Sequence, residues 1–170
     1  MLGYITAEGR GVADRLLAEL AQDLLARSVS VAGVVQINRE TRTDRHCDMD
    51  LQVLGHDHHV RISQNLGPHA RGCRLDPDGL ETAVGLVEAD LARRPALLIL
   101  NKFGKSELDG RGFRNVIGLA LSDGIPVLTA VNKANLVGFR DFADGLAQEV
   151  AADPHALMTW CKKLTTAHTG

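Results

Sequence analysis

Two glycines near the start of the chain, Gly9 and Gly11, stand where backbone amides could hold a phosphate. They follow a short apolar run at residues 2–6, which predicts a strand, and precede residues 12–27, whose apolar side chains recur at helical spacing. The first N–H groups of a helix have no partner within the helix and attract anions. The sequence therefore predicts a phosphate-binding loop over residues 6–12.

This loop lacks the two side chains that nucleotide hydrolysis requires. In the pattern G-x-x-x-x-G-K-[ST], the lysine neutralises the outer phosphates and the hydroxyl binds magnesium. Here Thr6 replaces the first glycine, Val12 the lysine and Ala13 the hydroxyl. Arg10 could supply a displaced cation, whereas Glu8 would repel phosphate. We expect binding through the backbone with weak or no hydrolysis, and a plain structural turn is the alternative.

A second candidate group follows the buried strand predicted at residues 96–101. In enzymes with a phosphate-binding loop, such a strand ends in an aspartate, often followed by a glutamate, for magnesium and water. This chain instead has Asn101 there, and the candidate catalytic residues that follow are Lys102, Lys105 and Glu107. Glu107 would act as a substitute carboxylate and the lysines as cations. Alternatively, Asn101 caps the strand and both lysines are solvated.

A polar cluster between residues 46 and 76 suits a tetrahedral oxyanion, either phosphate or molybdate. Arginine forks and a serine hydroxyl bind such anions, and side chains two positions apart on a strand share a face. The candidate ligand-binding residues are Cys47, Asp50, Arg61, Ser63, Arg71, Cys73 and Arg74. An ion pair of Arg61 with Asp48 or Asp50 across a hairpin is the alternative.

Two further features of this cluster concern metals. If Cys47 and Cys73 meet, they could bind a soft metal or form a disulfide, whereas a free cysteine is usually a small buried hydrophobe. The histidines at positions 46, 56, 58, 59 and 69 are assigned no role, because a hairpin turn supplies no closed ligand set. No metal site is predicted.

The elements that must position these residues alternate between buried strands and helices. Strands are predicted at 29–37, 96–101 and 124–131, an antiparallel hairpin at 47–64, and helices at 77–94, 111–122, 136–151 and 154–164. Asp76 and Pro77 are typical of a helix start. This order predicts an α/β fold of three layers with a mostly parallel sheet, in one domain over 1–170 with a hairpin inserted at about 44–64. In such sheets the site lies beyond the carboxyl ends of the strands.

The composition argues against several classes of protein. The 170 residues are 24% charged and 45% hydrophobic, and the formal net charge of -2 at pH 7 does not favour nucleic acid or an anionic membrane. No apolar segment approaches the roughly 18 residues of a membrane span, and no secretory leader is visible. Three scattered cysteines do not form a secreted disulfide framework. We therefore expect a cytoplasmic protein.

The order of these elements resembles the small P-loop nucleoside triphosphatases first known from thermophiles. The glycine loop, the strand "VAGVVQIN", the hairpin, the segment "LLILNKFGKSEL" and the strand "GIPVLTAV" follow one another as they do in that family. The chain is also similar to an uncharacterised bacterial branch of that superfamily at "HCDMDL", "RISQNLGPHARGCRLD" and "LNKFGKSELDGRG". Genes of this branch often lie beside molybdate-transport genes.

These resemblances imply a P-loop-like fold and a role in molybdenum metabolism. The ligand would be a small-molecule nucleotide, with Mg²⁺, or an oxyanion such as molybdate, and a protein partner in molybdenum handling is possible. An active magnesium-dependent triphosphatase and a non-enzymatic molybdate-responsive regulator or chaperone are the two alternatives. The changes at Val12, Ala13 and Asn101 depart from the triphosphatase pattern and favour weak or absent hydrolysis.

Overall fold

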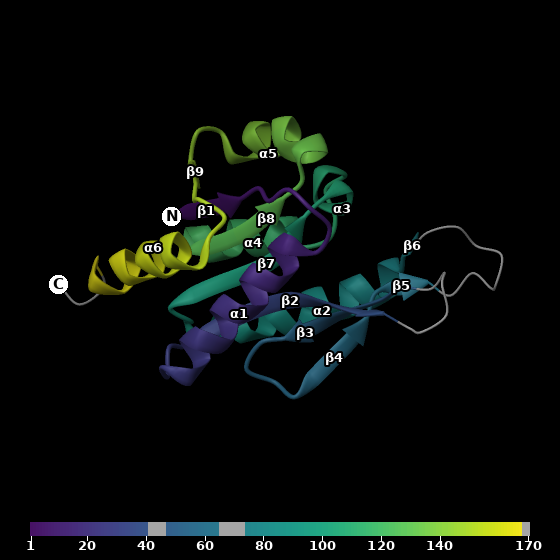
Figure 1. Ribbon diagram of the computed structural model, residues 1–170, viewed down its shortest axis with the longest axis horizontal. Coiled ribbons are helices and arrows are strands. Elements are labelled where there is room, and N and C mark those ends of the chain that lie inside the picture. Colours follow the sequence, from purple (N-terminus) through teal and green to yellow (C-terminus); the bar gives the residue numbers. More distant parts are fainter. Residues whose placement is uncertain (41–46, 65–73, 168–170) are drawn as a thin grey trace.

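The computed structural model describes residues 1–40, 47–64 and 74–167 of the chain, and Figure 1 shows them as a layered α/β arrangement. Within these residues, seven strands form one sheet in the order β4-β3-β2-β7-β8-β1-β9. The strands are β1 (Leu2–Ile5), β2 (Val31–Glu40), β3 (Cys47–Val53), β4 (His58–Arg61), β7 (Leu97–Phe103), β8 (Val127–Val131) and β9 (Ala147–Glu149). A separate pair consists of β5 (Ser63–Gln64) and β6 (Arg74–Leu75).

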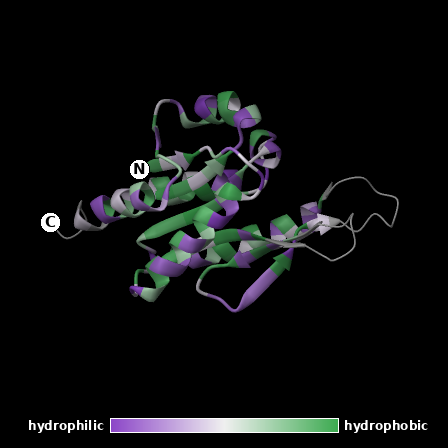
Figure 2. Ribbon diagram, viewed as in Figure 1, coloured by the Kyte–Doolittle hydropathy of each residue, from purple (hydrophilic) through white to green (hydrophobic). Residues whose placement is uncertain are grey.

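The sheet is parallel except at one edge. β2, β7, β8, β1 and β9 pair in parallel, while β3 runs antiparallel to both β2 and β4. This arrangement confirms the predicted α/β fold with a mostly parallel sheet and an antiparallel hairpin. The hydropathy of the strands agrees with their places in the sheet. Figure 2 shows that the central strand β7 is mainly hydrophobic, as suits its burial, and that the more exposed edge strand β4 is largely hydrophilic.

Helices cover both faces of the sheet and complete the three layers. The helices are α1 (Val12–Ala26), α2 (Pro77–Asp90), α3 (Lys105–Leu108), α4 (Arg114–Ser122), α5 (Leu136–Ala143) and α6 (Pro154–Ala167), with short 3-10 turns η1 (Leu91–Arg93) and η2 (Lys133–Asn135). α1 and α6 pack with Ile5 and Ile99 on one face, whereas α2, α4 and α5 pack with Tyr4 and Leu98 on the other. Adjacent strand residues thus enter opposite cores, as a strand buried on both faces requires.

The start of α2 follows the prediction from sequence. The Asp76 side chain accepts a hydrogen bond of 3.1 Å from the Asp78 backbone N–H, and Pro77 occupies the first turn. An aspartate cap satisfies an amide that the helix itself leaves unpaired, and proline has no N–H to lose there. Gly79 lets the helix approach the hairpin, because a Cβ at this position would lie 2.2 Å from the Arg61 carbonyl oxygen.

The helix predicted at 136–151 is too long, and its second half is wrong. α5 ends at Ala143, and the chain turns at Asp144 and Gly145, whose φ angles are 46° and 78°. The left-handed region ends a helix, and glycine adopts it without steric cost. The following residues form β9, whose Ala147 pairs with Leu2 of β1. Pairing with a distant strand outweighs the local helical pattern here.

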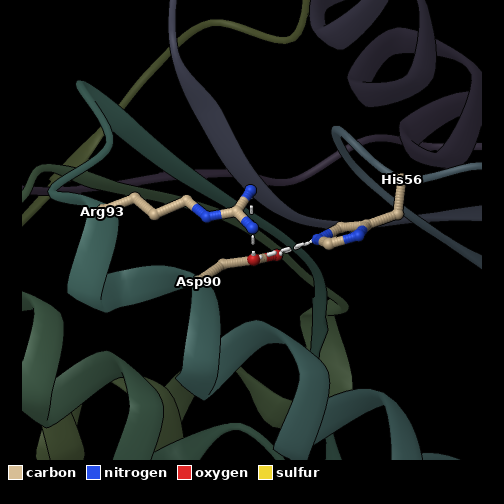
Figure 3. Close-up of polar contacts among 3 residues, drawn as sticks. All are labelled: His56, Asp90 and Arg93. Atoms are coloured by element: carbon tan, nitrogen blue, oxygen red, sulfur yellow. Dashed lines mark hydrogen bonds and ion pairs between the residues drawn. The ribbon is translucent and has the colours of Figure 1, made fainter.

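The turn of the β3–β4 hairpin is fixed to the end of α2. Figure 3 shows the His56 ring pointing at the Asp90 carboxylate, with Arg93 approaching the same carboxylate from its other side. His56 Nε2 lies 2.9 and 2.7 Å from the two Asp90 oxygens, and Arg93 Nη1 lies 4.0 Å from Oδ1. Asp90 is buried, so these partners compensate for the loss of its water shell.

Candidate functional site

The loop between β1 and α1 presents the start of a helix without a side-chain cap. Gly9 and Gly11 adopt φ angles of 96° and 74°, a region that glycine enters without strain. Gly11 is the N-cap of α1 and makes no side-chain cap hydrogen bond. The amides of the first turn therefore have no capping oxygen from this position, and a bound anion could take its place.

Two long-range contacts hold this loop against its neighbours. Thr6 Oγ1 donates to Glu149 Oε1 of β9 at 3.2 Å, and Lys133, the first residue of η2, forms an ion pair with Glu8. The hydrogen bond and positive charge of Lys133 lower the pKa of the Glu8 carboxyl. Lys133 thus neutralises the charge that made Glu8 unfavourable for phosphate. Arg10, the predicted displaced cation, is exposed, and Val12 is half-buried.

Lys133 is a residue to which sequence reasoning gave no role. Its position in "NKAN" after a buried strand was the available signal, because the ends of parallel strands gather at one edge. The pairing with Glu8 joins residues separated by 125 positions, and no local spacing predicts it.

Asn101 belongs to the strand instead of capping it. β7 continues to Phe103, and its register with β8 shifts between Leu100 and Phe103. Asn101 is 2% exposed, and its Nδ2 donates a 2.7 Å hydrogen bond to Asp14 Oδ1 in the first turn of α1. The Oδ1 atom of Asn101 is buried without a hydrogen-bond partner among the described residues. Asp14 is a second residue that the sequence pattern did not reveal.

Glu107 organises the loop after β7. Its Oε2 accepts from the Gly104 N–H at 2.8 Å and its Oε1 from the Phe113 N–H at 3.1 Å. The side chain is 3% exposed, and burial raises the pKa of its carboxyl. A Cβ at Gly112 would lie 2.2 Å from Oε1, so only glycine leaves room for this carboxylate. The contacts of Glu107 are therefore those of a loop-forming residue, and its catalytic role stays a prediction.

The neighbours of Glu107 strengthen the same loop. Arg114 Nη1 donates to the Glu107 carbonyl oxygen at 3.1 Å, and the Arg114 guanidinium lies 4.9 Å from the centre of the Phe142 ring. Of the predicted lysines, Lys102 is half-buried at the end of β7 and Lys105 is exposed at the start of α3. The structure thus places both lysines beside the carboxyl edge of the sheet.

The predicted oxyanion cluster is described only in part. Asp50 and Arg61 face each other across the hairpin and form an ion pair, which is the alternative considered from sequence. Ser63 Oγ accepts from the Met49 N–H at 3.1 Å. Cys47 lies in β3 and Arg74 in β6, but their side chains fall outside the described part of the chain.

Arg71 and Cys73 lie outside the described residues altogether, so the meeting of Cys47 with Cys73 stays a prediction. Among the side chains that are described, no group of three or more His, Cys, Asp or Glu could hold a metal ion. In the same residues, no helix is long and apolar enough to cross a membrane. Cys161 is buried in α6 with its thiol free.

Comparison with solved structures supports the fold. THEP1 from the hyperthermophile Aquifex aeolicus matches with a TM-score of 0.65 over 96% of each chain, at 15% sequence identity. The chain therefore has a P-loop NTPase-like fold. At this identity, the likeness establishes the architecture and does not establish a shared activity.

Sequence comparison adds a curated relative and a family. The Molybdenum import ATP-binding protein ModC 2 of Bradyrhizobium diazoefficiens is 33% identical over 149 residues, which are 86% of this chain and 16% of that protein. The chain thus spans about a sixth of the length of the relative it matches. Residues 2–160 match the model of the family described as "Protein of unknown function (DUF2478)". This match covers most of the chain, and the chain belongs to that family.

Proposed function

We propose that this chain binds the phosphates of a nucleotide at the loop between β1 and α1 and hydrolyses them weakly or not at all. The observation that carries the proposal is the start of α1 behind Gly9 and Gly11, which has no side-chain cap and lies at the carboxyl edge of a parallel sheet. A helix start offers N–H donors and the positive end of the helix dipole to an anion. The P-loop NTPase-like fold supports the same site.

Nearby cations support phosphate binding despite the missing loop lysine. Lys133 pairs with Glu8, and an incoming phosphate would compete with Glu8 for this ammonium group. Lys102 is half-buried at the end of the neighbouring β7. Because Glu8 and Lys133 are both largely exposed, their ion pair is weak and exchangeable.

Three positions support weak or absent hydrolysis. Val12 and Ala13 offer neither the ammonium group nor the hydroxyl of an active loop, and Asn101 stands where an acidic side chain would organise magnesium and water. Glu107, the substitute carboxylate considered from sequence, uses both oxygens to accept backbone hydrogen bonds. No described side chain among these four supplies the positioned base that attack by water needs.

A role in molybdenum metabolism is the second part of the proposal. Its support is the 33% identity to part of a protein named as a molybdenum import ATP-binding protein. A nucleotide-dependent contact with a partner protein in molybdenum handling would suit a binding site without efficient hydrolysis. Molybdate binding by Arg71, Cys73 and Arg74 remains a separate prediction for the cluster.

Titration calorimetry with ADP, ATP, GTP, molybdate and sulfate tests these assignments on the reduced protein. We expect nucleotides to bind, Lys133→Ala to weaken their affinity, and the exposed Lys163→Ala in α6 to leave it unchanged. Phosphate release from ATP should stay near the uncatalysed background. If molybdate binds and nucleotides do not, and if Arg71→Ala abolishes this binding, the nucleotide site is contradicted. The ligand site would then be the oxyanion cluster between residues 46 and 76.

A further inference from the structure

A buried acceptor lies beside the glycine loop. Asn101 is 2% exposed, and its Oδ1 has no hydrogen-bond partner among the described residues. The Asp14 carboxylate determines the orientation of this amide, because Nδ2 donates to Asp14 at 2.7 Å and an amide oxygen in its place would be repelled. Buried acceptors without partners are rare and destabilising, so Oδ1 indicates a group that a ligand brings to this place.

We infer that Asp14 and Asn101 form the protein's half of a divalent-cation site, which a bound phosphate completes. The inference rests on the proposed phosphate binding at the start of α1. Asp14 lies in the first turn of α1, three positions after Gly11. Its carboxylate would repel a phosphate bound there, whereas a cation bound between the two anions attracts both.

The donor set fits magnesium. Mg²⁺ takes oxygen ligands and is usually bound through one or two carboxylates together with substrate phosphates, while keeping several waters. Asp14 offers a carboxylate, and the Asn101 Oδ1 can accept a hydrogen bond from a metal-bound water. When bound, the cation would neutralise phosphate charge.

The protein's share of this site is incomplete by itself. Among the described residues no group of three or more His, Cys, Asp or Glu could hold a metal ion. The cation should therefore bind together with phosphate and only weakly without it. An active triphosphatase pattern has a hydroxyl at position 13 and a carboxylate at position 101, whereas this chain has alanine and an amide there. The carboxylate of the proposed site is instead that of Asp14, in the first turn of α1.

The test measures ADP affinity by calorimetry in EDTA and in excess Mg²⁺. The wild-type protein is compared with Asp14→Asn, which keeps an acceptor for the Asn101 amide, and with Asp23→Asn, which changes an exposed carboxylate on the same helix. We expect Mg²⁺ to tighten ADP binding in the wild type and in Asp23→Asn. In Asp14→Asn the tightening of ADP binding by Mg²⁺ should be about 10- to 100-fold smaller, while the protein remains folded.

Mn²⁺ provides a second readout, since electron paramagnetic resonance reports the free ion. Free Mn²⁺ should fall on addition of protein and ADP together, and only slightly with protein alone. If Asp14→Asn does not fold, Asn101→Ala takes its place and should also reduce the Mg²⁺ effect.

The outcomes separate this inference from the proposed function. ADP binding that ignores Mg²⁺ in the wild type, or a Mg²⁺ effect that persists in Asp14→Asn, would overturn the cation site and leave phosphate binding intact. Tight Mn²⁺ binding without ADP would contradict completion by phosphate. Absence of ADP binding under both conditions would overturn the proposed function and the inference together.

Discussion

The side-chain amide of Asn101 donates a 2.7 Å hydrogen bond to the carboxylate of Asp14 and so joins the end of β7 to the first turn of α1. The two residues are 87 positions apart in the chain. The pair fixes the position of the glycine loop relative to the sheet, because α1 begins at the end of that loop. An amide paired with a carboxylate is the stable combination here, whereas two carboxylates at this separation would repel each other.

Exchanging the two side chains tests this pairing. Asn101→Asp alone should destabilise the fold by about 1–3 kcal/mol, since it places a second carboxylate at a buried position. The double variant Asp14→Asn with Asn101→Asp restores one amide and one carboxylate and should recover most of the loss. Urea denaturation of the four proteins in the cycle gives the coupling free energy. A double variant no more stable than Asn101→Asp would contradict the pairing.

Glu107→Gln tests the loop after β7. The amide NH₂ of glutamine would face a backbone N–H of Gly104 or Phe113, so one hydrogen bond is lost and stability should fall by about 1–3 kcal/mol. The same variant tests the catalytic prediction. If Glu107 organised metal or water, phosphate release from ATP would collapse in a folded Glu107→Gln protein. We instead expect that the wild-type protein and Glu107→Gln both release phosphate only at the uncatalysed background rate.

Stability should depend on pH through the same carboxyl. Burial raises the pKa of Glu107 above its ordinary value of 4.5, so the folded state favours the protonated form. The contribution of protonated Glu107 to folding stability is therefore complete below pH 4.5, and it declines as the pH rises through the raised pKa. The stability gap between wild type and Glu107→Gln should be widest at acidic pH and narrow towards neutrality. Denaturation series across this range would show a constant or widening gap if the direction were wrong.

Removing the His56 ring should weaken the attachment of the hairpin to α2. In His56→Ala the buried Asp90 carboxylate loses its contacts of 2.9 and 2.7 Å and keeps Arg93 at 4.0 Å, so we expect a cost of about 1–3 kcal/mol. His58→Ala changes an exposed side chain two positions away and serves as the matched control. Thermal denaturation compares the two, and equal melting temperatures would exclude a stabilising role for the His56–Asp90 contact.

The Cys161 thiol should react slowly in the folded protein. It is 3% exposed, and burial raises its pKa to about 11. At pH 8 about one thiol in a thousand is then ionised, and the thiolate is the reactive form. In a Cys47→Ser, Cys73→Ser background, iodoacetamide should label Cys161 rapidly only after unfolding in urea. Equally fast labelling of the folded protein would show that this part of α6 opens to solvent.

The fold could be predicted further than the site, and the residues show why. Continuous apolar strands and the Asp76–Pro77 helix start are local signals, so the layers and the start of α2 follow from sequence. β9 was not predicted, because its partner strand β1 lies at the other end of the chain. The segment that contains β9 was instead assigned to the helix predicted at 136–151. Asp14 and Lys133 were missed because their contacts depend on strand order, which places β8 between β7 and β1.

Phosphate binding at the start of α1 is tested most directly by titrating ¹⁵N-labelled protein with ADP and Mg²⁺ and following the backbone amide resonances. The proposed site predicts that the largest shifts belong to Gly9, Gly11 and the first turn of α1, with smaller shifts at Lys133. Shifts concentrated between residues 47 and 76, or no shifts at saturating ADP, would contradict phosphate binding at this loop.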